Sequence, residues 1–293
     1  YAAGSSAGFS VGEGGVACWS GSMLSLIDAE KGSVPYSGHL ENPVISARYG
    51  KHYTAAQVAS LEAGVVQEHN STMLLLDSGG RNVERIDLPN QTVLDFGFFY
   101  NGSNTLFWVM SLDTEGTEPV TTVKVYRPGK MVLAGTITDP MQVLYEVAFQ
   151  PSKIRTVGET YVKDFDYTNK EITDNRILVY GWYLMGKDDS ATNPTMVFVP
   201  SSQADGSEGI SDIRIIQGQS DKSIRLPSEA KQVFVSGDSV YAFANDRVMV
   251  TSGGSLEPVA YALPLYIDRV IALTEGHSAI VTAGNAVYMI PLS

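Results

Sequence analysis

The sequence has one cysteine, few cations and no long apolar run, and each shortage excludes a class of protein. Cys18 has no second cysteine to pair with, so no internal disulfide holds the fold. Lys and Arg number 20 against 32 Asp and Glu, which gives a net charge of −12. This charge argues against nucleic acid as a partner, because phosphate binding depends on clustered Lys and Arg. No stretch of about 18 apolar residues is present, so we expect no membrane span of that kind.

Sequence signatures of catalytic and metal sites are also missing. The four histidines lack the H-x-x-x-H and H-E-x-x-H spacings of zinc sites. Residues 8–12 (GFSVG) match the G-x-S-x-G nucleophile pattern, but no helical pattern follows them, as a nucleophile elbow requires. These absences favour a non-enzymatic protein, and we predict no catalytic residue, no metal and no cofactor. The histidines are His39, His52, His69 and His277.

Short strand-like runs fill the sequence instead. The chain has 28 glycines and 13 prolines, as expected where many short strands need many turns. Residues 232–237, 239–245, 247–251 and 256–263 are four such runs with very short connections. Only antiparallel hairpins can be joined so briefly, so each group of four predicts an antiparallel meander. The ambiguous segment 54–66 (TAAQVASLEAGVV) is interpreted as a strand and a turn.

One strand of this meander recurs along the chain. It is found at residues 23–28 (MLSLID), 73–77 (MLLLD), 122–127 (TVKVYR), 195–200 (TMVFVP), 248–251 (VMVT) and 286–291 (AVYMIP). Subtracting successive end positions (28, 77, 127, 200, 251 and 291) gives steps of 49, 50, 73, 51 and 40. A four-stranded unit cannot bury both its faces alone, so repeated units pack as the blades of a β-propeller.

We therefore predict an all-β, six-bladed β-propeller of four-stranded antiparallel blades, with five or seven blades as alternatives. The predicted single domain covers residues 1–293. Its blades are expected at about residues 5–40, 41–89, 90–139, 140–227, 228–265 and 266–293.

The last predicted blade has only three strands, at residues 269–275, 278–283 and 286–292. Residues upstream of Tyr1 could supply the fourth strand, the blade could be three-stranded, or residues 7–11 could close the ring. The chain begins at Tyr1 rather than at a methionine, which is consistent with removal of an upstream segment such as a signal peptide or an anchor.

The turn after the recurring strand carries a family resemblance. In residues 26–32 (LIDAEKG) and 76–80 (LDSGG) the strand ends in Asp and a turn leads to Gly. This module resembles quinoprotein-type and related bacterial cell-surface propellers, and it fits equally a propeller family of unknown function. The tryptophan docking pattern of quinoprotein repeats is absent after these glycines, so no quinone site is implied. The resemblance implies an extracellular or cell-surface location in a bacterium, with anchoring through upstream residues as one form of it.

The long fourth unit supplies the candidate site. Residues 150–176 and 201–211 are predicted loops that leave the blade by the same edge, and long loops on a rigid scaffold concentrate function. The first contains residues 159–167 (ETYVKDFDY), whose aromatic and acidic side chains suit a sugar or a peptide. The alternative is an extra hairpin that extends the blade. The predicted ligand-binding residues are Tyr161, Asp164, Asp166 and Tyr167.

Together these features predict a binding or scaffold propeller on the exterior of a bacterial cell. It would be a monomer and contact a protein or a polysaccharide through one face. The alternative is an extracellular glycan hydrolase or lyase, which would need a pair of carboxylates at a fixed separation.

Overall fold

The computed structural model describes residues 7–62, 65–101, 104–130, 132–140, 142–150, 152–166, 171–188, 194–205, 208–252, 255, 257–274 and 278–292. These residues form strands β1 to β27 and one short 3-10 helix, Ser201–Gln203. Within this part of the chain no helix is long and apolar enough to cross a membrane. The chain divides into two compact units, the first mainly from residues up to Val147 and the second mainly from Thr173 onward.

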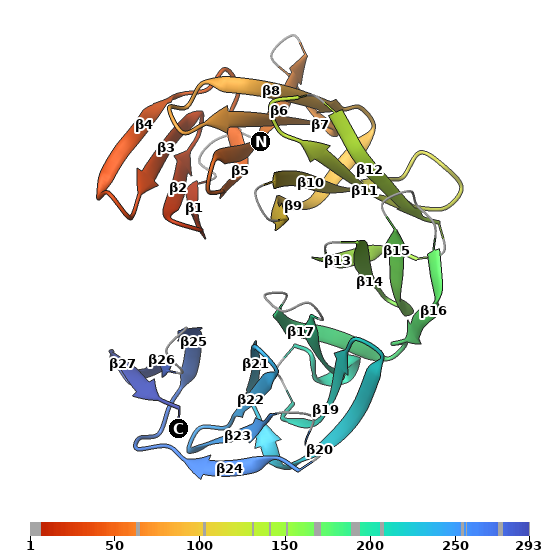
Figure 1. Ribbon diagram of the computed structural model, residues 1–293. Coiled ribbons are helices and arrows are strands. Elements are labelled where there is room, and N and C mark those ends of the chain that lie inside the picture. The colour runs from red at the N-terminus through yellow and green to blue at the C-terminus, as the bar shows by residue number, and fades with distance from the viewer. Residues whose placement is uncertain are drawn as a thin grey trace. The chain divides into compact units, whose positions relative to one another are not determined.

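Three four-stranded antiparallel sheets lie in the first unit, each made of consecutive strands (Figure 1). The first is β1 (Ala7–Gly12), β2 (Gly15–Ser20), β3 (Met23–Asp28) and β4 (Ser33–His39). The second is β5 (Val44–Tyr49), β6 (Tyr53–Glu62), β7 (Val65–Asp77) and β8 (Asn82–Leu88). The third is β9 (Gln91–Asn101), β10 (Asn104–Asp113), β11 (Val120–Arg127) and β12 (Val132–Asp139).

Four further sheets follow along the chain. The fourth is β13 (Leu144–Phe149), β14 (Lys153–Gly158), β15 (Tyr161–Asp166) and β16 (Glu171–Leu178). The fifth is β17 (Trp182–Asp188), β18 (Thr195–Pro200), β19 (Ile210–Gln217) and β20 (Ser220–Ala230). The sixth is β21 (Gln232–Ser236), β22 (Ser239–Phe243), β23 (Arg247–Thr251) and β24 (Val259–Ala262). The seventh has three strands, β25 (Arg269–Thr274), β26 (Ser278–Ala283) and β27 (Ala286–Pro291).

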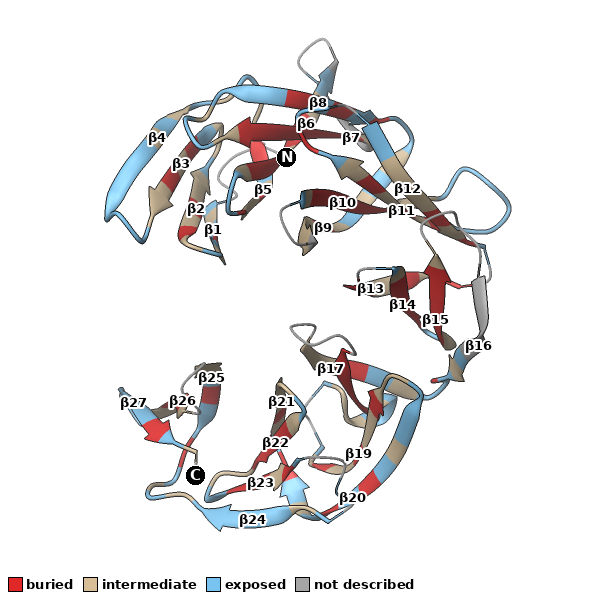
Figure 2. Ribbon diagram, viewed as in Figure 1, coloured by how far each residue is buried: buried red, intermediate tan, exposed pale blue. Residues whose placement is uncertain are grey.

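Period-two patterning explains how a central strand such as β7 packs on both faces of its sheet (Figure 2). In β7, Leu74 and Leu76 point to one side of the sheet, and Met73 and Leu75 point to the other. Complete burial of a leucine side chain stabilises the fold by about 1.5–3 kcal/mol, so a strand buried on both faces holds its two neighbouring sheets together. The first pair packs with Ala17, Leu24 and Leu26, and the second pair packs with Phe96, Phe107 and Val109.

The all-β fold of four-stranded antiparallel meanders is confirmed, but the count of six blades is not. The described residues form seven sheets, which matches the alternative count of seven. Residues 140–227 contain two sheets, because most of segment 150–176 forms β14, β15 and the start of β16 rather than a loop. The repeat misses two third strands, β15 (YVKDFD) and β19 (ISDIRIIQ). In β15 the buried Lys163 and Asp164 break the apolar pattern.

The first and the last described strands of the chain can each be assigned to a sheet. The seventh sheet has three strands, as the sequence predicts. Strand β1 pairs with β2 from Ala7 to Gly12, so it is the first strand of the first sheet. Most of segment 54–66 forms β6 and the beginning of β7, which confirms the strand, while residues 63–64 between them lie outside the described residues.

Candidate functional site

The predicted ligand-binding residues lie on strand β15 and not on a loop. Asp164 is completely buried, while Tyr161 and Asp166 are half-buried. Alternation along the strand places Asp164 and Asp166 on one face and Tyr161 on the other, so the strand does not bring all of them together. Tyr167 lies outside the described residues. Ligand binding by these four residues stays a prediction.

The ring of Tyr161 already has cationic neighbours. The Lys163 Nζ atom lies 5.6 Å from the Tyr161 ring centroid, and Arg176 Cζ lies 5.3 Å from it. Both distances are typical of cation–π contacts. Tyr161 therefore has a structural role within the second unit, whatever else it contacts.

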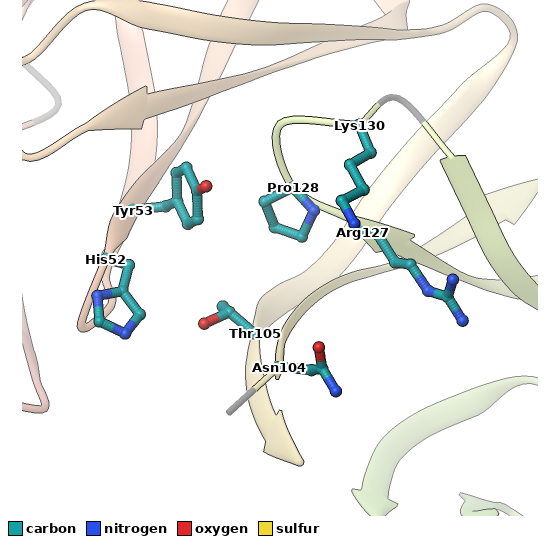
Figure 3. A pocket seen from close by; sticks show the side chains of 7 residues that line it. All are labelled: His52, Tyr53, Asn104, Thr105, Arg127, Pro128 and Lys130. Atoms are coloured by element: carbon teal, nitrogen blue, oxygen red, sulfur yellow. The ribbon is translucent and has the colours of Figure 1, made fainter. Parts of the chain in front are cut away.

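A pocket of about 250 Å³ in the first unit is the better candidate (Figure 3). Its walls come from the start of β6, the start of β10 and the turn between β11 and β12. Figure 3 shows His52 and Tyr53 on one side of the pocket and Arg127 and Lys130 on the other. The lining residues are His52, Tyr53, Asn104, Thr105, Arg127, Pro128 and Lys130.

A tight turn builds the cationic side of this pocket. The Lys130 backbone N–H donates to the Arg127 carbonyl at 3.3 Å, and Gly129 between them has a φ of 73°. Proline at the second position and a positive φ at the third define a type II turn, which the sequence Arg127–Pro128–Gly129–Lys130 suits. The turn presents both cationic side chains beside the buried Pro128.

Glu84 of strand β8 fixes this turn to the neighbouring sheet. Its Oε2 atom accepts a hydrogen bond from the Gly129 N–H at 3.2 Å, and the residue is only 5% exposed. Burial raises the pKa of the Glu84 carboxyl group, and the hydrogen bond from Gly129 opposes this effect more weakly. Burial of Tyr126 raises its pKa to about 12, and the nearby Glu84 charge contributes less to this increase.

The pocket concentrates positive charge in an acidic protein. Among the residues that the structure describes, no Asp or Glu lines it. Within the described part of the chain, neither Arg127 nor Lys130 has a carboxylate within ion-pair distance. Other cations of the same unit have a carboxylate oxygen at 2.7–3.3 Å. These are Lys31, Arg48, Lys51, Arg81 and Arg85. As far as the described residues extend, these two charges on one short turn are therefore available to an anionic ligand.

A second pocket of about 300 Å³ lies between strands of the first two sheets. Its floor is apolar, with Leu74 and Leu76, and its rim includes both Glu41 and Arg85. The Arg85 guanidinium is already paired with Asp87 at 3.0 Å. Its one arginine is therefore already neutralised, which makes this pocket the weaker candidate for an anionic ligand. Among the described residues no group of three His, Cys, Asp or Glu side chains could hold a metal ion.

Sequence reasoning missed the cationic pocket because its residues come from three short turns rather than from one long loop. One signal was present: residues 127–130 (RPGK) combine a turn-forming Pro-Gly pair with two cations in a chain that has few. The other walls could not be found without knowing which sheets are neighbours.

No protein-family model and no curated protein sequence matches this chain. Three solved structures are similar over nearly its whole length. A chain of the mitotic checkpoint complex has a TM-score of 0.57 and 10% identity, covering 97% of this chain and 90% of that one. The Pan2 WD40 domain of Neurospora crassa has a TM-score of 0.55 and 10% identity, with coverages of 96% and 86%. BamB from Moraxella catarrhalis has a TM-score of 0.50 and 9% identity, with coverages of 97% and 83%.

These likenesses and the consecutive four-stranded antiparallel sheets define the class of fold. The chain is a β-propeller repeat protein, as the repeat in its sequence predicts. At about 10% identity the likeness establishes the fold and nothing about ligands.

Proposed function

We propose that this chain is a non-enzymatic binding or scaffold propeller, a single monomeric domain of residues 1–293 on the exterior of a bacterial cell. It contacts a protein or a polysaccharide through the surface formed by the start of β6, the start of β10 and the turn Arg127–Lys130. One observation carries the proposal: Arg127 and Lys130, without ion-pair partners in the described part of the chain, lie on one pocket of a protein whose net charge is −12.

The chemistry of this pocket supports binding rather than hydrolysis. A glycan hydrolase needs two carboxyl groups that flank the scissile bond, and no Asp or Glu is found among the described residues that line the pocket. Its volume of about 250 Å³ is also below the roughly 300–1,000 Å³ that is typical of sites for small molecules. Such a pocket suits one residue of a larger polymer better than a whole free substrate.

Thermal unfolding in the presence of candidate polymers tests this proposal. The panel contains neutral and acidic polysaccharides and an acidic polypeptide, each with and without calcium. A ligand at a hundredfold excess over its Kd stabilises the folded state by about 2.7 kcal/mol. In a chain of this size that corresponds to a rise in Tm of several °C. The proposal is wrong if no polymer raises the Tm, or if the protein cleaves one of the polysaccharides.

A further inference from the structure

We infer that the cationic pocket binds a carboxylate-bearing sugar residue of an acidic polysaccharide. The inference rests on the proposed binding function and adds the class of ligand. It depends on charge, on the apolar walls and on the mixed hydrogen-bonding groups of the pocket.

Charge selects an anion. The Arg127 guanidinium presents several N–H donors in one plane, which can hold a carboxylate through two parallel hydrogen bonds. Lys130 supplies a second positive charge from the same turn, and Figure 3 shows both residues on the side of the pocket opposite His52 and Tyr53. A neutral sugar would leave both charges without a counterion, so the pocket favours an acidic residue.

The walls of the pocket suit a sugar ring. Tyr53 and Pro128 contribute two apolar ring surfaces, and Pro128 is buried while Tyr53 is half-buried. A pyranose has an apolar C–H face that can pack on such surfaces. The side chain of an acidic peptide has no comparable face and would leave Tyr53 and Pro128 unused.

The remaining lining residues suit sugar hydroxyl groups. Asn104 and Thr105 lie at the start of β10 and carry groups that both donate and accept hydrogen bonds. On the opposite side, His52 and the Tyr53 hydroxyl group can also donate and accept hydrogen bonds. A carboxylate can only accept hydrogen bonds. The hydrogen-bond acceptors of the pocket would therefore have no partner on an acidic amino-acid side chain, whereas sugar hydroxyl groups can donate to them.

Binding of oligogalacturonate to the full chain, measured by isothermal titration calorimetry, tests the inference. Its methyl ester has the same backbone without the charge, and poly-glutamate has the charge without the sugar. We expect oligogalacturonate to bind at least about tenfold more tightly than either, because charge-assisted hydrogen bonds are lost in one case and the ring contacts in the other.

Two double variants locate the site. R127Q/K130Q should weaken oligogalacturonate binding at least about tenfold. R225Q/K231Q removes the same charge from two exposed cations of the second unit and should change binding less than twofold. An unchanged Tm in each variant shows that the fold is retained. Tyr53→Ala should weaken oligogalacturonate but not poly-glutamate.

The possible failures are distinguishable. Equal binding of the methyl ester, tighter binding of poly-glutamate, or full affinity in R127Q/K130Q overturns the inference and leaves the binding function in place. If none of the three polymers nor any other polymer of the panel binds, the proposed function fails as well.

Discussion

Glu84 is a buried carboxylate, and we expect its replacement by glutamine to stabilise the protein increasingly as the pH rises. The residue is 5% exposed, and among the described residues the hydrogen-bond partner of its carboxyl group is the Gly129 N–H at 3.2 Å. Burial raises the pKa of Glu84 above the 4.5 of an unfolded chain. In Glu84→Gln the amide oxygen can still accept the hydrogen bond from Gly129, while the charge is gone.

The sign of the pH effect follows from linkage. Because the folded pKa is raised, the stability that protonated Glu84 contributes is complete below the unfolded pKa of 4.5 and is lost as the pH rises through the folded pKa. The wild-type protein loses this contribution and the variant does not. One net hydrogen bond offsets part of the cost of burying the charge, so we expect a difference on the order of 1 kcal/mol between pH 4 and pH 8.

Differential scanning calorimetry of both proteins between pH 4 and pH 8 measures this effect. A change of 1 kcal/mol corresponds to about 2–4 °C in Tm for a large domain. The quantity to compare is the Tm of the variant minus that of the wild type, because any cost of the buried amide group does not change with pH. Glu115→Gln, at an exposed position, is the control and should show no such trend. A Tm difference that stays constant or falls with pH would refute the reasoning.

Three further predictions concern the turn, the core and a second turn. Gly129→Ala should destabilise the protein by about 1–2 kcal/mol in urea unfolding, because φ is 73° and a Cβ would meet the Tyr53 hydroxyl at 3.3 Å; Gly21→Ala, with φ 58° and open space around it, should cost less. Leu75→Ala should cost about 2–5 kcal/mol, since Leu75 is completely buried, whereas Leu94→Ala at an exposed position should cost far less in the same assay. Asp77 accepts hydrogen bonds from the Arg81 and Gly79 N–H groups and its pKa is lowered, first by the Arg81 backbone. The stability that ionised Asp77 contributes is present above pH 3.8 and is lost as the pH falls through the folded pKa. Asp77→Ala should therefore lower the Tm at pH 7 more than at pH 2.5, and an equal loss at both pH values would contradict this explanation.

The sequence predicts the sheets where the third strand is apolar and ends at a turn. Residues 23–28, 122–127, 248–251 and 286–291 all lie in third strands. Residues 195–200 lie in β18, the second strand of its sheet, and this misplacement made two sheets look like one long unit. One cause is β15, where Lys163 and Asp164 are buried in positions that elsewhere hold apolar residues. Hydrophobic periodicity cannot detect a strand whose interior positions are charged.

The candidate site could not be predicted for a different physical reason. Length was used as the sign of a functional loop, but the long segment folded into strands. The pocket instead forms where turns of two sheets meet, and its walls include His52 and Arg127, which are far apart in the sequence. The packing of Met73 and Leu75 of β7 against Phe96, Phe107 and Val109 brings these two sheets together.

The net charge has opposite consequences at long and at short range. At an ionic strength of about 0.1 M the Debye length is about 10 Å, so the repulsion between an acidic surface and a polyanion fades beyond the first contacts. Inside the pocket Arg127 and Lys130 act at hydrogen-bonding distance, where screening is much weaker. A duplex nucleic acid needs many cations along its length, and the chain has few. A single carboxylate needs only the two cations that this turn provides. An acidic protein with a local cationic pocket can therefore reject extended polyanions of high charge density and still bind one acidic sugar residue.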